Sequence, residues 1–109
     1  MSVNISKTID ALAIRDTSAH DGDTVYNGDF QVKTIIVENS LNQQVSLQCQ
    51  ASANEDFSNY FNVGSAFDVT ATTNSYQTCD SYFPYWRGVA TCASAPTTGA
   101  LTVFIYGVE

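Results

Sequence analysis

Hydrophobic and polar residues alternate with a period of two along several stretches of the chain. From residue 45 to 51, the odd positions carry Val, Leu, Cys and Ala, and the even positions carry Ser and Gln. Residues 66–73 repeat the alternation with a threonine-rich polar face, and residues 30–40 are rich in β-branched side chains. Because side chains along a strand point alternately to its two faces, these stretches predict strands with one buried face.

The strongest alternation lies near the end of the chain, in residues 84–94 and 101–107. One face of the first segment carries Trp86, Gly88, Ala90 and Cys92, and the other carries Tyr85, Arg87, Val89 and Thr91. The second segment sets Leu101, Val103 and Ile105 against Thr102, Phe104 and Tyr106. The sequence APTTG between them has the proline and glycine of a turn, so we expect a hairpin that places the two strands side by side.

Weaker strand patterns occur at 2–9, 11–15, 23–27 and 57–63. The chain then holds about eight short strands separated by polar turns, and no segment has the period of a helix. This predicts an all-β, single-domain antiparallel β-sandwich over residues 1–109, either jelly-roll-like or Ig-like. Residues 1–15 have few core positions of their own, which leaves open an N-terminal arm that adds a strand to a neighbouring subunit.

The segment YFPYWRGVATC, residues 82–92, concentrates aromatic side chains around Pro84. One interpretation is a platform on which Tyr82, Phe83, Tyr85 and Trp86 stack against sugar rings. The other is the start of a strand, where proline is tolerated because no ladder hydrogen bond need be donated. Trp86 and Gly88 are two residues apart, so they point to the same face of a strand. Glycine is small enough to leave room for a large ring, which favours a strand with Trp86 in the core.

Composition narrows the classes of function. Only 14% of the residues are charged, against about 25% in an average soluble domain, and the net charge is −7. Proteins that grip phosphate backbones need the opposite sign, so nucleic acid is not an expected partner. The chain has no apolar run long enough for a membrane-spanning helix and no secretion leader at its N-terminus, so we expect no membrane partner and synthesis in the cytoplasm.

Few residues are candidates for catalysis or metal binding, and for each of them a purely structural role explains the sequence as well. The three cysteines, Cys49, Cys79 and Cys92, lack metal-site spacing; buried free thiols are favoured, and one disulfide with one free thiol stays open. The candidate metal ligands His20, Asp21, Asp23 and Asp29 do not match an EF-hand loop, so a polar turn is favoured over calcium. Glu55 and Asp56 adjoin in a loop-like stretch, which favours a solvated turn over a catalytic pair. We therefore expect no enzyme, metal or cofactor.

Three blocks of the chain, VENSLNQQVSLQCQAS, VGSAFDVTA and YQTCDSYFPYWRGVATCASAPTTGALTVFIYG, resemble a module of small structural proteins of phages and other viruses. In that module a strand ending in VEN precedes a V.Q.Q strand, and a YFPYLR-like start leads to a TAPTSGSLTV-like end. The resemblance covers roughly residues 32–107. It implies a β-sandwich in a virion or surface assembly and no catalytic residue. The chain departs from the pattern at Cys79, Trp86, Gly88 and Cys92, where aliphatic or small residues are commoner.

The outward residues of the last two strands predict an interaction surface. If the strands are neighbours, one face joins Tyr85, Arg87, Val89, Phe104 and Tyr106. Such a patch is best buried by another copy of the chain or by a capsid or other virion protein. We therefore expect a non-enzymatic virion structural protein, a self-associating β-sandwich that decorates or cements a viral capsid. The alternatives are a carbohydrate-binding or adhesive module using Tyr82–Trp86, and a subunit of an extracellular filament or surface layer.

Overall fold

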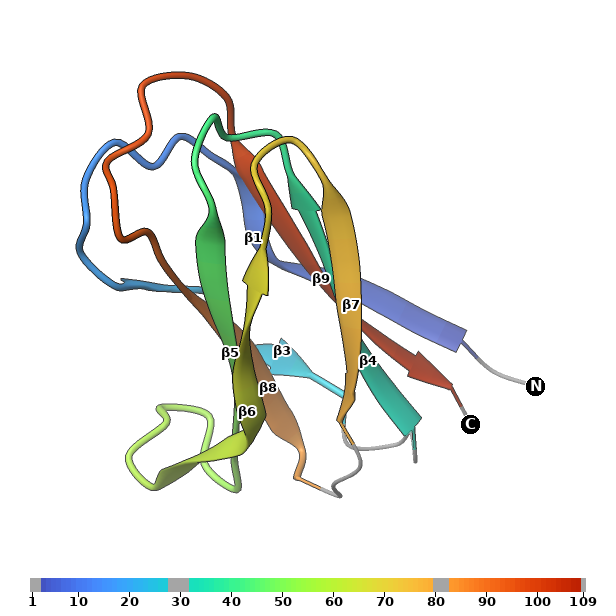
Figure 1. The fold of residues 1–109 in the computed structure, drawn as a ribbon. Coiled ribbons are helices and arrows are strands. Elements are labelled where there is room, and N and C mark those ends of the chain that lie inside the picture. Colours follow the sequence, from blue (N-terminus) through green and yellow to red (C-terminus); the bar gives the residue numbers. More distant parts are fainter. Residues whose placement is uncertain (1–2, 28–31, 80–82, 109) are drawn as a thin grey trace.

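The computed structural model describes residues 3–27, 32–79 and 83–108 and is shown in Figure 1. Within these residues the chain forms nine strands: β1 Val3–Leu12, β2 His20–Asp21, β3 Val25–Tyr26, β4 Val32–Asn39, β5 Val45–Ser52, β6 Tyr60–Val69, β7 Asn74–Cys79, β8 Tyr85–Thr91 and β9 Leu101–Val108. The all-β prediction is confirmed. No helix in the described part of the chain has the length and apolar character to cross a membrane.

The strands form two antiparallel sheets packed face to face. Sheet A has the order β1-β9-β4-β7, and sheet B has the order β2-β8-β5-β6, with the short β3 also paired to β8. Successive strands cross from one sheet to the other, except that β3 follows β2 and β6 follows β5 within sheet B. Of the two sandwich types that the sequence left open, this alternation between a four-stranded and a five-stranded sheet is the jelly roll, with β2 and β3 both paired to β8 at one edge of sheet B.

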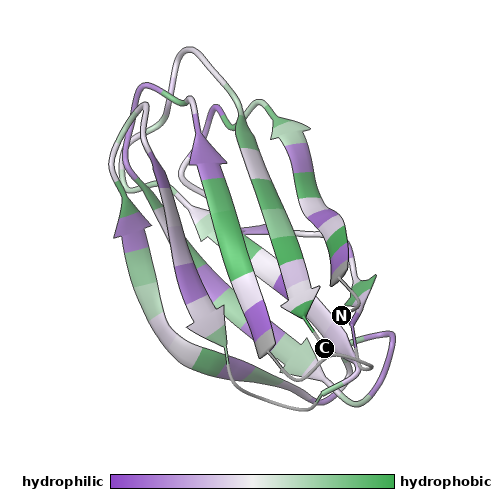
Figure 2. Cartoon of the chain, turned by 90° about the vertical axis from the view of Figure 1, so that its right-hand side faces the viewer, coloured by the Kyte–Doolittle hydropathy of each residue, from purple (hydrophilic) through white to green (hydrophobic). Residues whose placement is uncertain are grey.

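The core lies between the sheets and is built from the predicted inward positions. Fully buried side chains come from β5, β8 and β9, on the parities that the sequence analysis assigned to the interior: Val45, Leu47, Cys49, Ala51, Trp86, Ala90, Leu101, Val103 and Ile105. Figure 2 shows the corresponding bands of hydrophobic and hydrophilic residues that alternate along the strands. Period two in the sequence therefore located the inward apolar residues of these three strands correctly.

The hairpin predicted between residues 84–94 and 101–107 is wrong. β8 lies in sheet B and β9 in sheet A, so residues 92–100 cross between the sheets (Figure 1). The side chain of Asn42, in the connection that follows β4, holds this crossing: its Oδ1 accepts from the Thr97 amide at 2.9 Å and its Nδ2 donates to Thr97 Oγ1 at 2.8 Å. Turn residues specify that the chain bends, and these long-range contacts specify where it goes.

Two details of the strand assignment differ from the pattern expected from the sequence. Residues 57–63 and 66–73 were expected as separate strands, but the single strand β6 spans residues 60–69 and bends at a bulge opposite β5. Strand β7 had no predicted counterpart, because its residues NSYQTC are mostly polar and its side chains largely exposed. Residues 3–12, within the segment considered as an arm, form β1 and pair with β9 of the same chain.

Candidate functional site on the outer faces of the two sheets

The five predicted interface residues do not share one face. Tyr85, Arg87 and Val89 lie on β8 in sheet B, whereas Phe104 and Tyr106 lie on β9 in sheet A. All five are half-buried and point away from the core, as their parity predicted. Because the two sheets pack against each other through their inner faces, the outward residues end up on opposite sides of the molecule. The single patch predicted from the sequence is therefore two separate surfaces.

The outer face of sheet A combines aromatic and aliphatic side chains from all four strands. The strand register aligns them in rows across the sheet: Ile5–Tyr106–Thr34–Thr78, then Lys7–Phe104–Ile36–Tyr76, then Thr102–Glu38–Asn74. Tyr76 is 70% exposed and Ile5 is 53% exposed. Lys7 Nζ lies 5.8 Å from the centroid of the Phe104 ring, so the ammonium sits at the border of the apolar rows.

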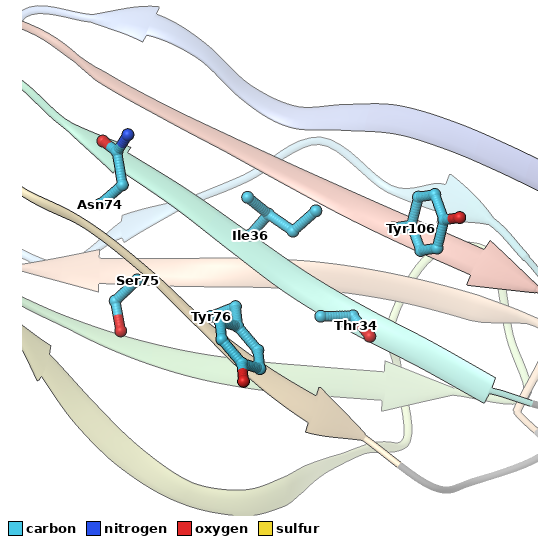
Figure 3. Close-up of a pocket in the computed structure, with 6 residues that line it drawn as sticks. All are labelled: Thr34, Ile36, Asn74, Ser75, Tyr76 and Tyr106. Carbon is cyan, nitrogen blue, oxygen red and sulfur yellow. The ribbon is translucent and has the colours of Figure 1, made fainter.

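An open groove of about 430 Å³ runs over β7, β4 and β9 on this face. It is lined by Thr34, Ile36, Asn74, Ser75, Tyr76 and Tyr106, which Figure 3 shows with the two tyrosines on opposite sides of β4. Every lining residue is uncharged in a protein whose net charge is −7. We call the five apolar and aromatic residues of these rows the sheet A patch: Ile5, Ile36, Tyr76, Phe104 and Tyr106.

The outer face of sheet B is organised by Arg87. Its Nε donates to Gln50 Oε1 at 2.9 Å, and Gln50 Nε2 donates to Asn62 Oδ1 at 3.1 Å, which links β8, β5 and β6. The guanidinium also lies 4.3 Å from the ring centroid of Phe57 and 5.4 Å from that of Tyr60. These contacts hold the Arg87 side chain against its own chain and use its Nε donor and part of its stacking surface.

The aromatic platform proposed for residues 82–86 does not form as expected. Trp86 is completely buried, and its indole N–H donates to the Phe83 carbonyl at 2.6 Å, which confirms the core position inferred from its parity. Phe83 stacks on Phe61 with ring centroids 5.4 Å apart. Tyr82 lies outside the described residues. Of the four aromatics, the buried Trp86 cannot stack on a sugar ring.

Tyr85 instead belongs to a different aromatic group. Its ring meets that of Tyr26 edge to face at 5.6 Å, and both tyrosines line a hollow of about 270 Å³ together with Thr24 and Glu55. Tyr26 was not among the predicted site residues, because the two-residue strand β3 that carries it is too short to separate an outer from an inner face. Its pairing with β8 opposite Tyr85 exists only in the folded chain.

The candidate metal ligands are used in local contacts. His20 Nε2 lies 2.7 Å from Asp16 Oδ1, and Arg87 Nη1 lies 3.8 Å from Asp21 Oδ2. The hydrogen bond with His20 lowers the pKa of Asp16 below its ordinary value of 3.8. Asp29 lies outside the described residues, and among those described no group of three or more His, Cys, Asp or Glu side chains is placed to hold a metal ion.

None of the three cysteines is part of a disulfide in the described structure, and all three are buried. Burial raises the pKa of the Cys92 thiol above its ordinary value, with a smaller contribution from the negative charge of Asp16. The pKa of Cys49 is raised first by a hydrogen bond with the Cys79 thiol and then by burial. A raised pKa leaves less of the reactive thiolate at neutral pH, so neither residue has the character of a catalytic nucleophile.

Three members of the sheet A patch were not found from the sequence. Ile36 lies in the run IIV of β4, which has no alternation to separate its outer from its inner side chains. Tyr76 belongs to the unpredicted strand β7, and Ile5 to a segment considered as an arm. The sequence held one signal for this face: Tyr76 is an aromatic residue in an otherwise polar segment, and that segment pairs with the β-branched run of β4.

Comparison with known proteins gives structural matches only. No family model and no curated protein matches the sequence. The fold is similar to PBSX exported protein XepA (TM-score 0.73, 12% identity, 97% of this chain and 37% of that chain) and to SPBc2 prophage-derived protein YomS (0.57, 14%, 99% and 94%). It is also similar to PirA (0.59, 14%, 95% and 92%) and to a chain of infectious bursal disease virus Gx strain (0.55, 7%, 96% and 31%).

These similarities cover nearly all of this chain but only about a third of XepA and of the viral chain. With identities of 7–14%, they establish a shared fold and carry no residue from one protein to another. The chain therefore has the β-sandwich fold found in exported, prophage-derived and viral proteins.

Proposed function

We propose that this chain is a non-enzymatic structural component of a phage or viral particle, which associates with copies of itself and decorates or cements a capsid. The observation that carries the proposal is the sheet A patch, a set of apolar and aromatic side chains on the outside of a jelly roll, beside a groove lined only by uncharged residues. The expected place of the protein is the virion, and its expected partners are a second copy of the chain and a capsid or other virion protein.

The structural similarities support this context. A prophage-derived protein and a chain of a virus share the fold over at least 96% of the present chain. Jelly rolls are a recurrent building unit of viral capsids and also of lectins, so the fold is compatible with assembly and with sugar binding. Because function depends on sites rather than on folds, the outer faces have to decide between these uses.

The sheet A patch is suited to contact with a second copy. A monomer with net charge −7 repels its neighbours, and the groove between Tyr76 and Tyr106 is lined by uncharged residues, where close approach costs least. Tyrosine is enriched at interfaces because its ring is large and its hydroxyl can bond a partner. The molecule measures 38 × 30 × 21 Å, so a broad face can supply the roughly 800 Å² that each partner gives to a standard interface.

A test of association compares one substitution on each outer face. Tyr76→Lys places a charge in the sheet A patch at a position that is already 70% exposed, so the fold should be preserved. Val89→Lys places the same charge on the outer face of sheet B. We expect sedimentation equilibrium to show oligomers of the wild type and of Val89→Lys, and monomers of Tyr76→Lys.

Particle binding completes this test. Purified wild-type chain should co-sediment with the virus particles or empty shells of its own source, and Tyr76→Lys should co-sediment less. A wild-type chain that stays monomeric at high concentration and does not bind particles would contradict the proposal. If Val89→Lys dissociates the oligomers and Tyr76→Lys does not, the interface lies on the outer face of sheet B. Electron microscopy of the oligomers distinguishes a shell component from a filament or surface-layer subunit.

A second candidate, binding of a carbohydrate, is favoured by the hollow beside Tyr26 and Tyr85. Two tyrosine rings together with the side chains of Glu55 and Thr24 provide a stacking surface and hydrogen-bonding groups within one site. In this second candidate the site is formed by Thr24, Tyr26, Glu55 and Tyr85 instead of residues 82–86, because Trp86 is buried and cannot contact a ligand. Binding on a glycan array that is lost in Tyr85→Ala and kept in Tyr76→Lys would favour this function over assembly through the sheet A patch.

A further inference from the structure

Two of the three cysteines belong to opposite sheets and share one part of the core. Cys49 lies on the inner face of β5 in sheet B, and Cys79 is the last residue of β7 in sheet A. Their side chains are 0% and 3% exposed, and both belong to the same cluster of buried residues. Neither cysteine is near the other in sequence or in a strand pair, so only the packing of the two sheets brings them together.

The strand registers place the two thiols over the same region of the sandwich. Cys79 pairs with Lys33 in sheet A, and Lys33 Nζ lies 5.4 Å from the ring centroid of Trp86 in sheet B. Trp86 pairs with Ala51, which is two residues from Cys49 on the same inner face of β5. The Cys49 and Cys79 thiols are within hydrogen-bonding range of each other.

We propose that Cys49 and Cys79 form a disulfide that links the two sheets when the chain folds in the presence of a disulfide oxidant. The Cys79 side chain is a hydrogen-bond partner of Cys49, so the bond requires a local adjustment of the two side chains rather than a rearrangement of the sheets. Cys92 is excluded as a partner of either residue, because it follows β8 at the other end of that strand, where His20 pairs with Ala90.

The oxidant is a small-molecule or protein disulfide, RSSR, which accepts the two electrons. The thiolate of one cysteine attacks RSSR, forms a mixed disulfide and releases one RS⁻. The second thiolate attacks the protein sulfur of that mixed disulfide and releases the other RS⁻. The two protons lost by the cysteines end on the released thiols, so one RSSR and two protein thiols give one protein disulfide and two RSH.

Burial determines when this exchange takes place. A thiol in the core meets no oxidant, and the raised pKa of Cys49 leaves little thiolate for attack. We therefore expect the folded, reduced chain to oxidise slowly, and the chain refolding from denaturant in a glutathione redox buffer to oxidise readily. The bridge closes a loop between residues 49 and 79, which restricts the unfolded chain and should raise Tm by on the order of 10 °C.

The test is to refold the full chain with reduced and oxidised glutathione, alkylate the remaining thiols in denaturant, and measure the mass after trypsin digestion. Trypsin cleaves after Lys33 and Arg87, so the peptide 34–87 holds Cys49 and Cys79 together, and the peptide 88–109 holds Cys92. We expect an unalkylated 34–87 peptide two hydrogen atoms lighter than its reduced form, and an alkylated 88–109 peptide. Alkylation of all three cysteines, or a peptide linked through Cys92, would overturn the proposal.

Serine variants supply the controls. Cys92→Ser should keep the oxidised 34–87 peptide and the difference in Tm between oxidised and reduced protein. Cys49→Ser and Cys79→Ser should each abolish both. If Cys49→Ser and Cys79→Ser fail to fold, the peptide masses of the wild type and of Cys92→Ser still decide the question, because neither depends on those two variants.

Discussion

The backbone amide of Gly88 donates a hydrogen bond to the hydroxyl of Thr8 over 3.1 Å, which ties β8 in sheet B to β1 in sheet A. The same hydroxyl donates to the carbonyl of Asp23 at 2.7 Å. Thr8 sits where the register of β1 against β9 shifts between Lys7 and Ile9, and its side chain is buried although it belongs to an edge strand. A bulge has turned a polar side chain inward, where it connects both sheets.

The substitution Thr8→Val should destabilise the fold by about 1–3 kcal/mol. Valine keeps the shape of threonine but leaves the Gly88 amide and the Asp23 carbonyl without this partner in a buried position. Thr91→Val, on the outward face of β8, is the matched control and should change stability by less than about 0.5 kcal/mol. Urea unfolding followed by tryptophan fluorescence measures both. Equal stability of the two variants would show that the Thr8 hydroxyl does not hold the sheets together.

Alanine substitutions at Gly99 and Gly64 separate two costs: backbone strain, which applies at both positions, and steric overlap of the new Cβ, which applies only at Gly99. Both have positive φ, of 87° and 72°, so alanine at either position is strained by about 1–2 kcal/mol. At Gly99 a Cβ would also overlap the Ser40 carbonyl and lie 2.8 Å from Leu41 Cα, whereas at Gly64 it would meet only the Gln77 side chain at 3.5 Å or more.

Gly99→Ala should therefore destabilise the protein by about 1–3 kcal/mol more than Gly64→Ala, because the backbone of residues 40–41 has to move. Thermal unfolding of the two variants under identical conditions measures the difference. Equal values would mean that the crossing from β8 to β9 tolerates displacement, in conflict with its hydrogen bonds to Asn42.

Arg87→Ala should cost about 1–2 kcal/mol, because the guanidinium is mostly buried against Phe57 and bonded to Gln50. Lys7→Ala removes a cation at 5.8 Å from Phe104 on an exposed position and should cost less than about 0.5 kcal/mol. Hydrogen exchange should also accelerate in residues 53–59 of Arg87→Ala, since Phe57 loses its cover. Unchanged exchange in that loop would contradict the structural role assigned to Arg87.

The pair Asp16–His20 gives a prediction on pH. The pKa of Asp16 is lowered below 3.8, chiefly by the hydrogen bond with His20, so its folded value lies below its unfolded value. The contribution of Asp16 to stability is therefore present above pH 3.8 and is lost as the pH falls through the folded pKa. An NMR titration should show the pKa of Asp16 rising toward 3.8 in His20→Ala. An unchanged pKa would assign the shift to the Ser18 amide instead.

The alternation of residues determined the fold class and most of the core. In β5, β8 and β9 one side of each strand is apolar, and burial of that side is the main gain on folding, so the inward residues could be read without knowing which strands pair. The clearest case is the start of β8, where Trp86 is buried and the preceding residue, Tyr85, points to the other face and is half-exposed. Where a strand is polar, as in β7, the same signal was absent, and where a strand has only two residues, as in β3, it was weak.

Only the tertiary structure decided which surfaces exist. A turn sequence such as residues 95–99 specifies a reversal of direction but not the sheet that the chain joins afterwards. The crossing to sheet A separated Tyr85, Arg87 and Val89 from Phe104 and Tyr106. In sheet A, Ile36 lies beside Phe104, and Tyr76 lies beside Ile36 on the next strand. The pairing of distant strands and the packing of the two sheets depend on contacts between residues far apart in the chain, and a local pattern of side chains does not encode them.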